Sequence, residues 1–348
     1  MIRIGWGVIG ACGIALRRMI PEGIIPARQA VLRAVMDIDE ERVRQVGERF
    51  AVRRFTEVEP LLAYPEVQAV YIATPTIHHA PQALAAIEAG KHVLIEKPLA
   101  MTADEGAAIA EAARSKGVVA GVGFMMRHHG AHRRIKELID DGTLGTPVMG
   151  RAQLSCWYPP IEGAWRQDPA LGGGGAFIDM GNHCFDLLEM FFGRTTEVHA
   201  FTANRVHPYP SEDTALATFR FQSGALGIVD TLFNVPDDAS KNVLEIYGTR
   251  GAIRCKGTIG QGPGGSARLI ALEQKGYAAQ QDRGPARATR LRCGQVNTYL
   301  AEIRDFSDAI ALGHPPTCSI EDGVWNMKVV EAAYRSARTG CAVKLTEE

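Results

Sequence analysis

A lysine at the end of an apolar run is the residue of this sequence best placed to do chemistry. His92–Ile95 is short, apolar and partly β-branched, and Gly90 precedes it, which predicts a buried parallel strand. The run ends in Glu96-Lys97-Pro98, and open α/β sheets bind ligands at the carboxyl ends of their strands. Proline has no N–H to donate, so regular pairing should stop there. Lys97 is therefore a candidate catalytic group; a solvated Glu-Lys pair that closes a strand is the alternative.

A second candidate group follows a run of four glycines, Gly172–Gly175. Glycines permit close backbone approach or unusual dihedral angles where a helix begins. Asp179, His183 and Asp186 then fall at i, i+4 and i+7, which places them on one helical face. An aspartate one turn from a histidine can fix the ring tautomer and stabilise its charged form. The spacing suggests proton transfer by His183; a buried polar pair with a structural role is the alternative.

The first third of the chain contains the elements that must position Lys97. Strands are expected at Ile2–Ile9, Val31–Met36, Ala69–Ala73 and Val118–Val122, with helices between them. This alternation predicts βαβ units and a mostly parallel sheet. The loops that follow these strands and the lysine strand should carry their side chains at one common edge, which predicts a dinucleotide site with Gly10, Asp37, Thr74 and Lys97.

The loop after the first strand holds a degenerate dinucleotide-binding motif. In G-x-G-x-x-G the glycines make the turn, admit the pyrophosphate and let helix and strand pack closely. Gly10 fills the first place, Cys12 the second and Ala15 the third, so an ordinary strand–helix turn is an equal alternative. Asp37 could accept hydrogen bonds from both ribose hydroxyls and would repel a 2′-phosphate, which predicts NAD over NADP. Alternatively, Asp37 or Asp39 caps the helix that follows.

Composition limits the classes of protein to consider. The 348 residues predict two domains, and the net charge of −1 gives no electrostatic reason to expect nucleic acid or an anionic membrane as a partner. The seven cysteines are scattered and form no C-x-x-C pair, which fits reduced thiols in the cytoplasm. No apolar run approaches the ~20 residues of a membrane helix, and the first predicted strand leaves no room for a signal peptide.

Beyond Phe124 the pattern changes to closely spaced strands with few helices between them, which predicts an antiparallel sheet. We place a dinucleotide-binding domain at residues 1–122 and an α+β domain for substrate binding and oligomerisation at residues 123–348. Two helices should close the chain. The expected strands are Val148–Tyr158, Val198–Ala203, Thr214–Phe221, Ala225–Phe233, Val243–Tyr247 and Ala252–Cys255.

Taken together, these motifs resemble the glucose–fructose oxidoreductase/inositol dehydrogenase family, also called Gfo/Idh/MocA. The resemblance rests on Val8-Ile9-Gly10, Ala73-Thr74-Pro75 with His79, Glu96-Lys97-Pro98, the glycine run with Asp179 and His183, and Glu212-Asp213-Thr214-Ala215. It implies an N-terminal Rossmann domain with a doubly wound parallel sheet and a C-terminal open-faced, mostly antiparallel sheet. It also implies a cis peptide before Pro98, and a homodimer or homotetramer formed through the face of the second sheet.

The resemblance implies an NAD(P)-dependent dehydrogenase or reductase acting on a sugar, a polyol or a sugar derivative. The catalytic residues would be Lys97, Asp179 and His183, with no metal. Substrate contacts would come from Lys97, Trp165, Arg166, Asp179 and His183. The cofactor would bind to Gly10, Cys12, Gly13, Ile14, Asp37, Thr74, Pro75, His79, Glu96, Lys97 and Arg127.

Three alternatives remain open at this point. Arg127 could lie near the nicotinamide or could form a structural ion pair. Phe124–His129 and Trp165-Arg166 look most like the branch of sugar-type reductases that often prefers NADP, which conflicts with Asp37. The protein could therefore be an NADP-dependent reductase of a dicarbonyl sugar. A further alternative is a catalytically silent sensor that binds NAD or a sugar.

Overall fold

The computed structural model describes residues 3–240, 242–271 and 288–346. The chain forms two compact units, and each draws on separate stretches of sequence. The first unit runs through Met125 and also contains Glu162–Asp179 and Asn297–Glu331. The second contains Met126–Ile161, Met180–Val296 and the chain from Ala332 onward. The division into residues 1–122 and 123–348 stays a prediction.

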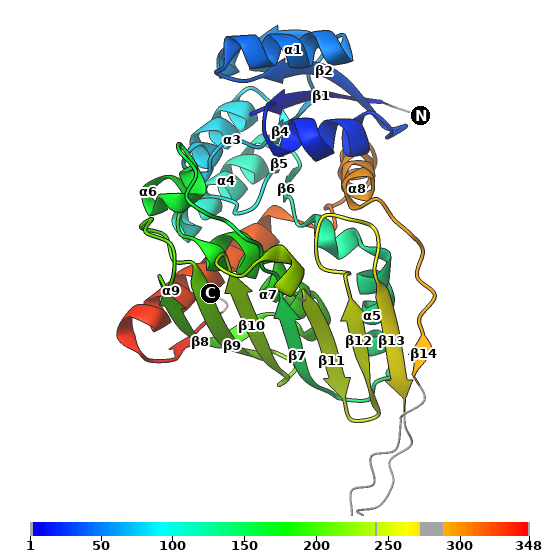
Figure 1. Cartoon of the computed structure of the whole chain (residues 1–348). Helices are drawn as coiled ribbons and strands as arrows, with labels where there is room; N and C mark the ends of the chain where they lie inside the picture. The colour runs from blue at the N-terminus through cyan, green and yellow to red at the C-terminus, as the bar shows by residue number, and fades with distance from the viewer. Residues whose placement is uncertain (1–2, 241, 272–287, 347–348) are drawn as a thin grey trace, which may run out of the picture. The chain divides into compact units, whose positions relative to one another are not determined.

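The first unit contains the expected parallel sheet. Its six strands all pair in parallel (Figure 1). Their order is β3 (Arg53–Phe55), β2 (Ala30–Met36), β1 (Ile4–Ile9), β4 (Ala69–Ile72), β5 (His92–Ile95) and β6 (Ala120–Val122). The central strands are buried runs of apolar residues, as expected for strands covered on both faces. The prediction of a doubly wound parallel sheet is confirmed, although Ile2 of the first predicted strand lies outside the described residues.

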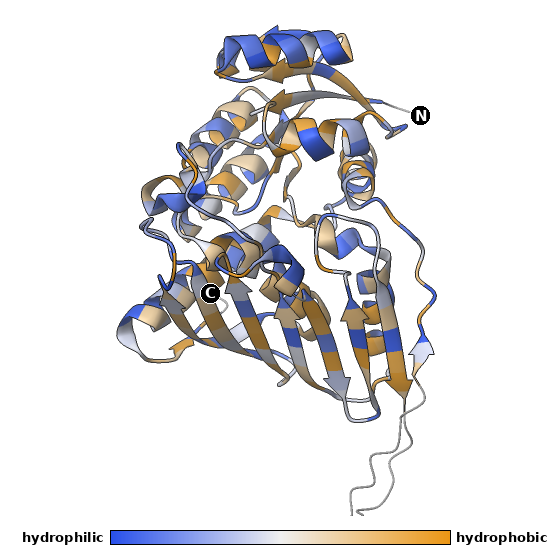
Figure 2. Ribbon diagram, in the orientation of Figure 1, coloured by the Kyte–Doolittle hydropathy of each residue, from blue (hydrophilic) through white to orange (hydrophobic). Residues whose placement is uncertain are grey.

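Helices connect these strands and complete the unit. Asp39 caps α1 by accepting the Arg42 N–H at 2.9 Å, and Thr102 caps α4 by accepting the Glu105 N–H at 3.1 Å. Figure 2 shows the hydrophilic surface of α1, which buries only Val43, Val46 and Gly47. The helical segments are η1 (Ala15–Ile24), α1 (Glu40–Phe50), α2 (Val58–Leu62), η2 (Thr76–His78), α3 (His79–Glu88), α4 (Ala103–Lys116), η4 (Trp165–Gln167), α6 (Pro169–Gly172) and α8 (Thr298–Leu312). Segment η5 (Phe177–Gly181) begins in this unit and ends in the second. The last long helix, α9 (Ile320–Thr339), continues from this unit into the second.

A late part of the chain completes the core of the first unit. Trp6 on β1 is fully buried, and its ring lies 5.6 Å from that of Phe306 on α8. The indole N–H of Trp6 donates a hydrogen bond to Ser307 Oγ at 3.3 Å. Helix α8 also packs along η1. The sheet that begins the sequence thus needs a helix from near the end of the sequence to bury its first strand.

The described residues of the second unit form a nine-stranded sheet, which is antiparallel except for the β7–β10 pair. The mostly antiparallel sheet is confirmed, and β13, β14 and β15 are strands that the pattern did not predict. In order, the strands are β14 (Thr289–Arg290), β13 (Ser266–Ala271), β12 (Gly251–Lys256), β11 (Val243–Gly248), β7 (Pro147–Gln153), β10 (Leu226–Leu232), β9 (Thr214–Phe221), β8 (Thr195–Ala203) and β15 (Val343–Lys344).

One face of this sheet is covered by helices α7 (Asn182–Phe192) and α5 (Gly130–Asp140) (Figure 1). Two shorter segments, η3 (Met125–His128) and η6 (Asp237–Ala239), are 3₁₀ turns. Strand β9 alternates strictly: Ala215, Ala217 and Phe219 are buried, whereas Leu216 between them is 43% exposed. This alternation is typical of an antiparallel sheet with one face on the core and one face open. No helix among the described residues is long and apolar enough to cross a membrane.

Candidate active site

Lys97 lies just after β5, and its ammonium group is held by Asp179. Nζ donates hydrogen bonds to Asp179 Oδ1 at 2.6 Å and to the Asp179 carbonyl oxygen at 2.8 Å. The two side chains are 10% and 13% exposed, so the ion pair is nearly buried but still reaches the surface of the first unit. The peptide bond between Lys97 and Pro98 is cis, which confirms the expectation. Two of the three predicted catalytic residues are therefore in direct contact.

Trp165 and Arg166, the two further residues predicted to contact the substrate, belong to the same cluster as Lys97 and Asp179. Arg166 Nε donates to Asp179 Oδ1 at 3.3 Å, and its guanidinium lies 4.1 Å from the centroid of the Trp165 ring. One carboxylate oxygen thus accepts hydrogen bonds from two cations. Stacking on an indole keeps the planar guanidinium in place while leaving part of it exposed. The structure brings Trp165 and Arg166 together with Lys97 and Asp179.

The glycine run explains how Asp179 reaches this position. Asp168 caps α6 by accepting the Ala170 N–H at 2.9 Å, and Gly173 ends that helix with φ of +84°, a conformation that favours glycine. A Cβ on Gly172 would lie 3.1 Å from the Trp165 carbonyl oxygen, so a side chain there would push against the Trp165 turn. The chain then enters η5, which carries Asp179.

Glu96 is used inside the fold. The Tyr71 hydroxyl donates to Glu96 Oε1, and the Lys97 N–H donates to Oε2 at 3.2 Å. Burial raises the pKa of Glu96, while the hydrogen bond from Tyr71 and the charge of Lys97 act in the opposite direction. Glu96 therefore ties the backbone of Lys97 to the adjacent strand β4. Its predicted cofactor contact stays a prediction.

His79 joins the loops after β4 and β5. Its Nδ1 lies 2.8 Å from the Pro98 carbonyl oxygen, and its Nε2 lies 2.9 Å from that of Thr74. Burial lowers the pKa of His79 to about 4. The Thr74 hydroxyl donates to Gln82 Oε1 at 2.7 Å, and Pro75 precedes the turn η2. Because both ring nitrogens face backbone carbonyls, His79 would act on a cofactor through the loops that it fastens.

The turn after β1 leaves room for a phosphate group. Gly10 has φ of +82°, and a Cβ there would lie 2.7 Å from the Ala73 carbonyl carbon. By contrast, a Cβ on Gly13 would meet no atom of the described residues within 4 Å. Ile14 has helical dihedral angles and leads into η1. The tight turn at Gly10 and the open space at Gly13 fit a pyrophosphate at the start of a helix.

Asp37 and an arginine missed in the sequence hold the two peptide groups on either side of Cys12 in this turn. The Cys12 N–H donates to Asp37 Oδ2 at 2.9 Å, and Arg42 donates to the Cys12 carbonyl oxygen at 2.9 Å. Burial, followed by the charge of Asp37, raises the pKa of Cys12 to about 12, so its thiol is unreactive. Ile38, next to Asp37 in the sequence, is 85% exposed and offers an apolar surface on which the base of a nucleotide could pack. The sequence signal that could have identified Arg42 was its position shortly after Asp37, in the first turn of the helix that follows β2.

The remaining two site candidates lie in the second unit. His183 is on α7 and is 8% exposed. Arg127 forms a nearly buried, two-pronged ion pair with Asp186: Nε lies 3.0 Å and Nη2 2.7 Å from Oδ1. This geometry supports the structural alternative for Arg127. His132 on α5 is fully buried, and its Nδ1 lies 2.8 Å from the Met126 carbonyl oxygen.

Comparison with known families matches both units. Residues 4–124 match the oxidoreductase family with an NAD-binding Rossmann fold, and residues 132–254 match the GFO/IDH/MocA C-terminal domain. Together these two matches span more than half of the chain.

Similar proteins cover almost the whole chain. The 1,5-anhydro-D-fructose reductase of Ensifer adhaerens is 31% identical over 343 residues, 98% of each chain. The scyllo-inositol 2-dehydrogenase (NAD(+)) of Bacillus subtilis is 30% identical over 323 residues, 91% of this chain and 89% of that protein. A solved structure of levoglucosan dehydrogenase, in complex with NADH and levoglucosan, has a TM-score of 0.87 at 25% identity and covers 99% of this chain and 100% of that chain. The protein is an oxidoreductase of the Gfo/Idh/MocA family.

Proposed function

We propose that this protein transfers a hydride reversibly between C4 of the nicotinamide of NAD and a hydroxyl-bearing carbon of a sugar, polyol or sugar derivative. The observation that carries the proposal is the nearly buried Lys97–Asp179 ion pair at the carboxyl end of β5. It lies at the same sheet edge as the turn at Gly10. The names of the similar proteins, a reductase and dehydrogenases of sugars and inositols, support the substrate class.

The residues of the first unit fit the dinucleotide. The backbone of Gly10 and Gly13 would hold the pyrophosphate, and Asp37 would accept hydrogen bonds from the adenosine ribose. Thr74 and Pro75 would line the nicotinamide end. When bound, the nicotinamide accepts or supplies the hydride, and the protein contributes position and electrostatics.

Lys97 would donate a hydrogen bond to the reacting oxygen of the substrate and stabilise the negative charge that develops there. His183 would take the hydroxyl proton in oxidation and return it in reduction. Asp179 keeps the Lys97 ammonium in place through its carboxylate and its carbonyl oxygen. Trp165 and Arg166 would contact the substrate hydroxyls.

A second candidate is an NADP-dependent reductase of a dicarbonyl sugar. Arg42 favours it, because this arginine and Asp37 both bind backbone atoms of Cys12, and a nearby arginine is what accommodates a 2′-phosphate in this fold. The carboxylate of Asp37 opposes it by charge repulsion. Affinities for NAD and NADP in Asp37→Ser and Arg42→Ala separate the two. Tighter NAD binding by the unchanged protein supports the first candidate, and tighter NADP binding supports the second.

The test of the main proposal is turnover on a panel of sugars and polyols, followed through NADH absorbance. Lys97→Met and His183→Ala should each lower kcat by about 10²–10⁴-fold, the range for a positioned proton-transfer group, with NAD affinity nearly unchanged. Lys91→Met is the matched control, because Lys91 lies at the other end of β5 and donates to the Val67 carbonyl oxygen at 2.7 Å. Full activity in Lys97→Met would remove Lys97 from the mechanism.

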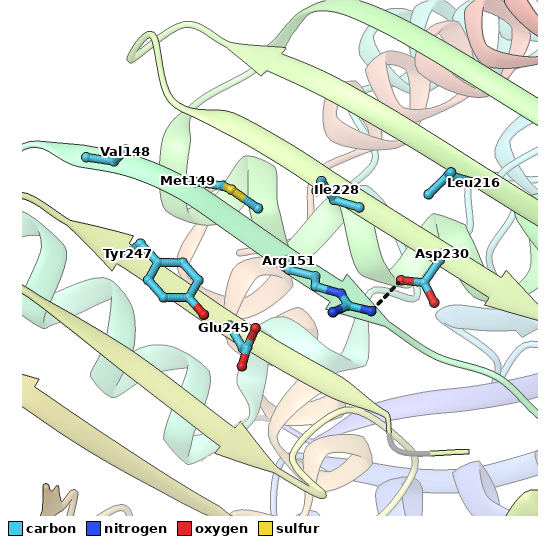
Figure 3. A pocket seen from close by; sticks show the side chains of 8 residues that line it. All are labelled: Val148, Met149, Arg151, Leu216, Ile228, Asp230, Glu245 and Tyr247. Carbon is cyan, nitrogen blue, oxygen red and sulfur yellow. Dashed lines mark hydrogen bonds and ion pairs between the residues drawn. The ribbon is translucent and has the colours of Figure 1, made fainter. Parts of the chain in front are cut away.

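For assembly we propose a homodimer or homotetramer formed through the open face of the second sheet. Figure 3 shows Met149, Leu216 and Ile228 on this face, and the dashed line marks the ion pair of Arg151 with Asp230. An exposed apolar surface with charges of both signs suits a self-complementary contact between two copies.

For cellular location we propose the cytoplasm. All seven cysteines are free thiols in the structure, including the buried Cys12, Cys184 and Cys318. A protein with several cysteines and no disulfide among them is typical of a reducing compartment.

A further inference from the structure

The first unit buries a carboxyl group that the proposed reaction does not use. Glu302 on α8 is 2% exposed, and neither of its carboxyl oxygens has a hydrogen-bond partner among the described residues. Burial raises the pKa of Glu302 well above its ordinary value, and the negative charges of Glu96 and Asp305 raise it further. An ionised carboxylate without donors in such a place is costly. Glu302 is therefore expected to be neutral in the folded protein.

Glu96 is in the opposite situation, although it lies within electrostatic reach of Glu302. Its two oxygens accept hydrogen bonds from the Tyr71 hydroxyl and the Lys97 N–H. Burial raises the pKa of Glu96, but these donors and the nearby Lys97 ammonium act in the opposite direction and favour its charged form. When two neighbouring carboxyl groups have such different surroundings, one stays ionised and the other stays protonated. Here the charge belongs on Glu96 and the proton on Glu302.

The other groups around Glu302 do not change this assignment. Tyr71 and Tyr299 both have their pKa raised by burial and by the neighbouring glutamates, so both remain neutral. Asp305 points to Thr317, whose N–H it accepts at 2.8 Å. On η1, Arg18 lies over the Tyr299 ring and pairs with Glu22 at 2.8 Å. No cation in the described ranges is within ion-pair distance of Glu302.

We propose that Glu302 is a positioning residue that stays protonated, so that the single negative charge of the Glu96–Glu302 pair remains on Glu96 and holds the backbone of Lys97. Ionisation of Glu302 would add a second negative charge within electrostatic reach of Glu96. The repulsion would weaken the hydrogen bond that fixes Lys97 at the strand end. The effect on turnover rests on the proposed function, whereas the protonation of Glu302 does not.

The first experiment measures folding stability against pH for the unchanged protein, Glu302→Gln and a control. A carboxyl that is protonated when folded and ionised when unfolded makes the protein less stable as pH rises above its unfolded pKa of about 4.3. Glutamine cannot ionise, so Glu302→Gln should become more stable than the unchanged protein as pH rises. Its unfolding constant should fall relative to that of the unchanged protein by up to about tenfold for each pH unit. Glu59→Gln, an exposed glutamate of α2, should follow the unchanged protein at every pH. A Glu302→Gln difference that is constant with pH would overturn the assignment.

The second experiment tests positioning. Turnover of the unchanged protein should fall at alkaline pH as Glu302 ionises, whereas Glu302→Gln should keep its kcat there, with the KM for NAD unchanged in both. If kcat fell equally at alkaline pH in the two proteins, Glu302 would not act on Lys97. The pH dependence of folding stability would still report whether Glu302 is protonated. Failure of the proposed function and failure of this inference are therefore distinguishable.

A third measurement does not depend on a variant that folds. Infrared spectroscopy of the unchanged protein at neutral pH should show the carbonyl band of a protonated carboxyl group, shifted in heavy water. Loss of that band in Glu302→Gln, where the variant folds, assigns it to this residue. Absence of the band in the unchanged protein would overturn the proposal.

Discussion

Asp179→Asn removes the carboxylate that neutralises Lys97 and keeps a side chain of nearly the same shape. Breaking a fully buried pair by removing one partner destabilises a protein by about 3–5 kcal/mol. Lys97 and Asp179 are 10% and 13% exposed, and Lys97 would keep its hydrogen bond to the Asp179 carbonyl oxygen at 2.8 Å. Both facts reduce the loss, so we expect roughly 2–3 kcal/mol. Arg166 would also lose its carboxylate partner.

The assay is denaturant unfolding of a double-mutant cycle built from Asp179→Asn, Lys97→Met and the double variant. The ammonium left unpaired in Asp179→Asn is absent in the double variant, which should therefore be more stable than the sum of the single changes predicts, by at least about 1 kcal/mol. Glu41→Gln breaks the exposed pair with Arg44 on α1 and should change nothing measurable. Additive single effects would refute the reasoning, because they would show that the two charges do not stabilise each other.

Three further predictions concern the turn, the buried histidine and the open sheet face. Gly10→Ala should abolish NAD binding and lower the melting temperature, since its φ is +82° and its Cβ would lie 2.7 Å from the backbone after β4; Gly13→Ala has free space and should retain the fold. Calorimetry measures both, and a stable Gly10→Ala that binds NAD would contradict the turn geometry. Burial lowers the pKa of His79 to about 4, so the folded protein binds fewer protons than the unfolded chain below about pH 6.5, and stability should fall by up to ~3 kcal/mol as pH drops to about 4. His79→Gln should show a shallower fall in thermal melts, and identical slopes would contradict this. Leu216→Lys should yield monomers in analytical ultracentrifugation, whereas Leu312→Lys on α8 should not; an unchanged assembly would exclude this face.

The parallel sheet and its functional edge could be predicted because their signals are local. Strands buried on both faces read as short apolar runs, and each ends in a recognisable loop at Gly10, Asp37, Thr74 or Lys97. The parallel direction of the strands then places these loops at one edge without any knowledge of long-range packing. The cis peptide before Pro98 came from the family resemblance alone.

What could not be predicted depends on contacts between distant parts of the chain. Lys97 and Asp179 are 82 positions apart, and nothing in either local sequence says that they pair. Strand β3 has only three residues and no buried one, so it has no apolar pattern to recognise. Glu302 reads as an ordinary polar position of a helix, and only the packed structure shows that no donor in the described part of the chain reaches its carboxyl group.

The covering of Trp6 by Phe306 and Ser307 has a consequence for anyone who wishes to excise the nucleotide-binding half of this enzyme. A gene fragment that stops at residue 122 would leave that indole facing water, and η1 would lose the helix that packs along it. A graft that keeps residues 297–331 joined to the first segment, by a short linker or by circular permutation, would restore both contacts. The useful modular boundary in this protein therefore follows spatial neighbourhood and cuts across the linear order of the gene.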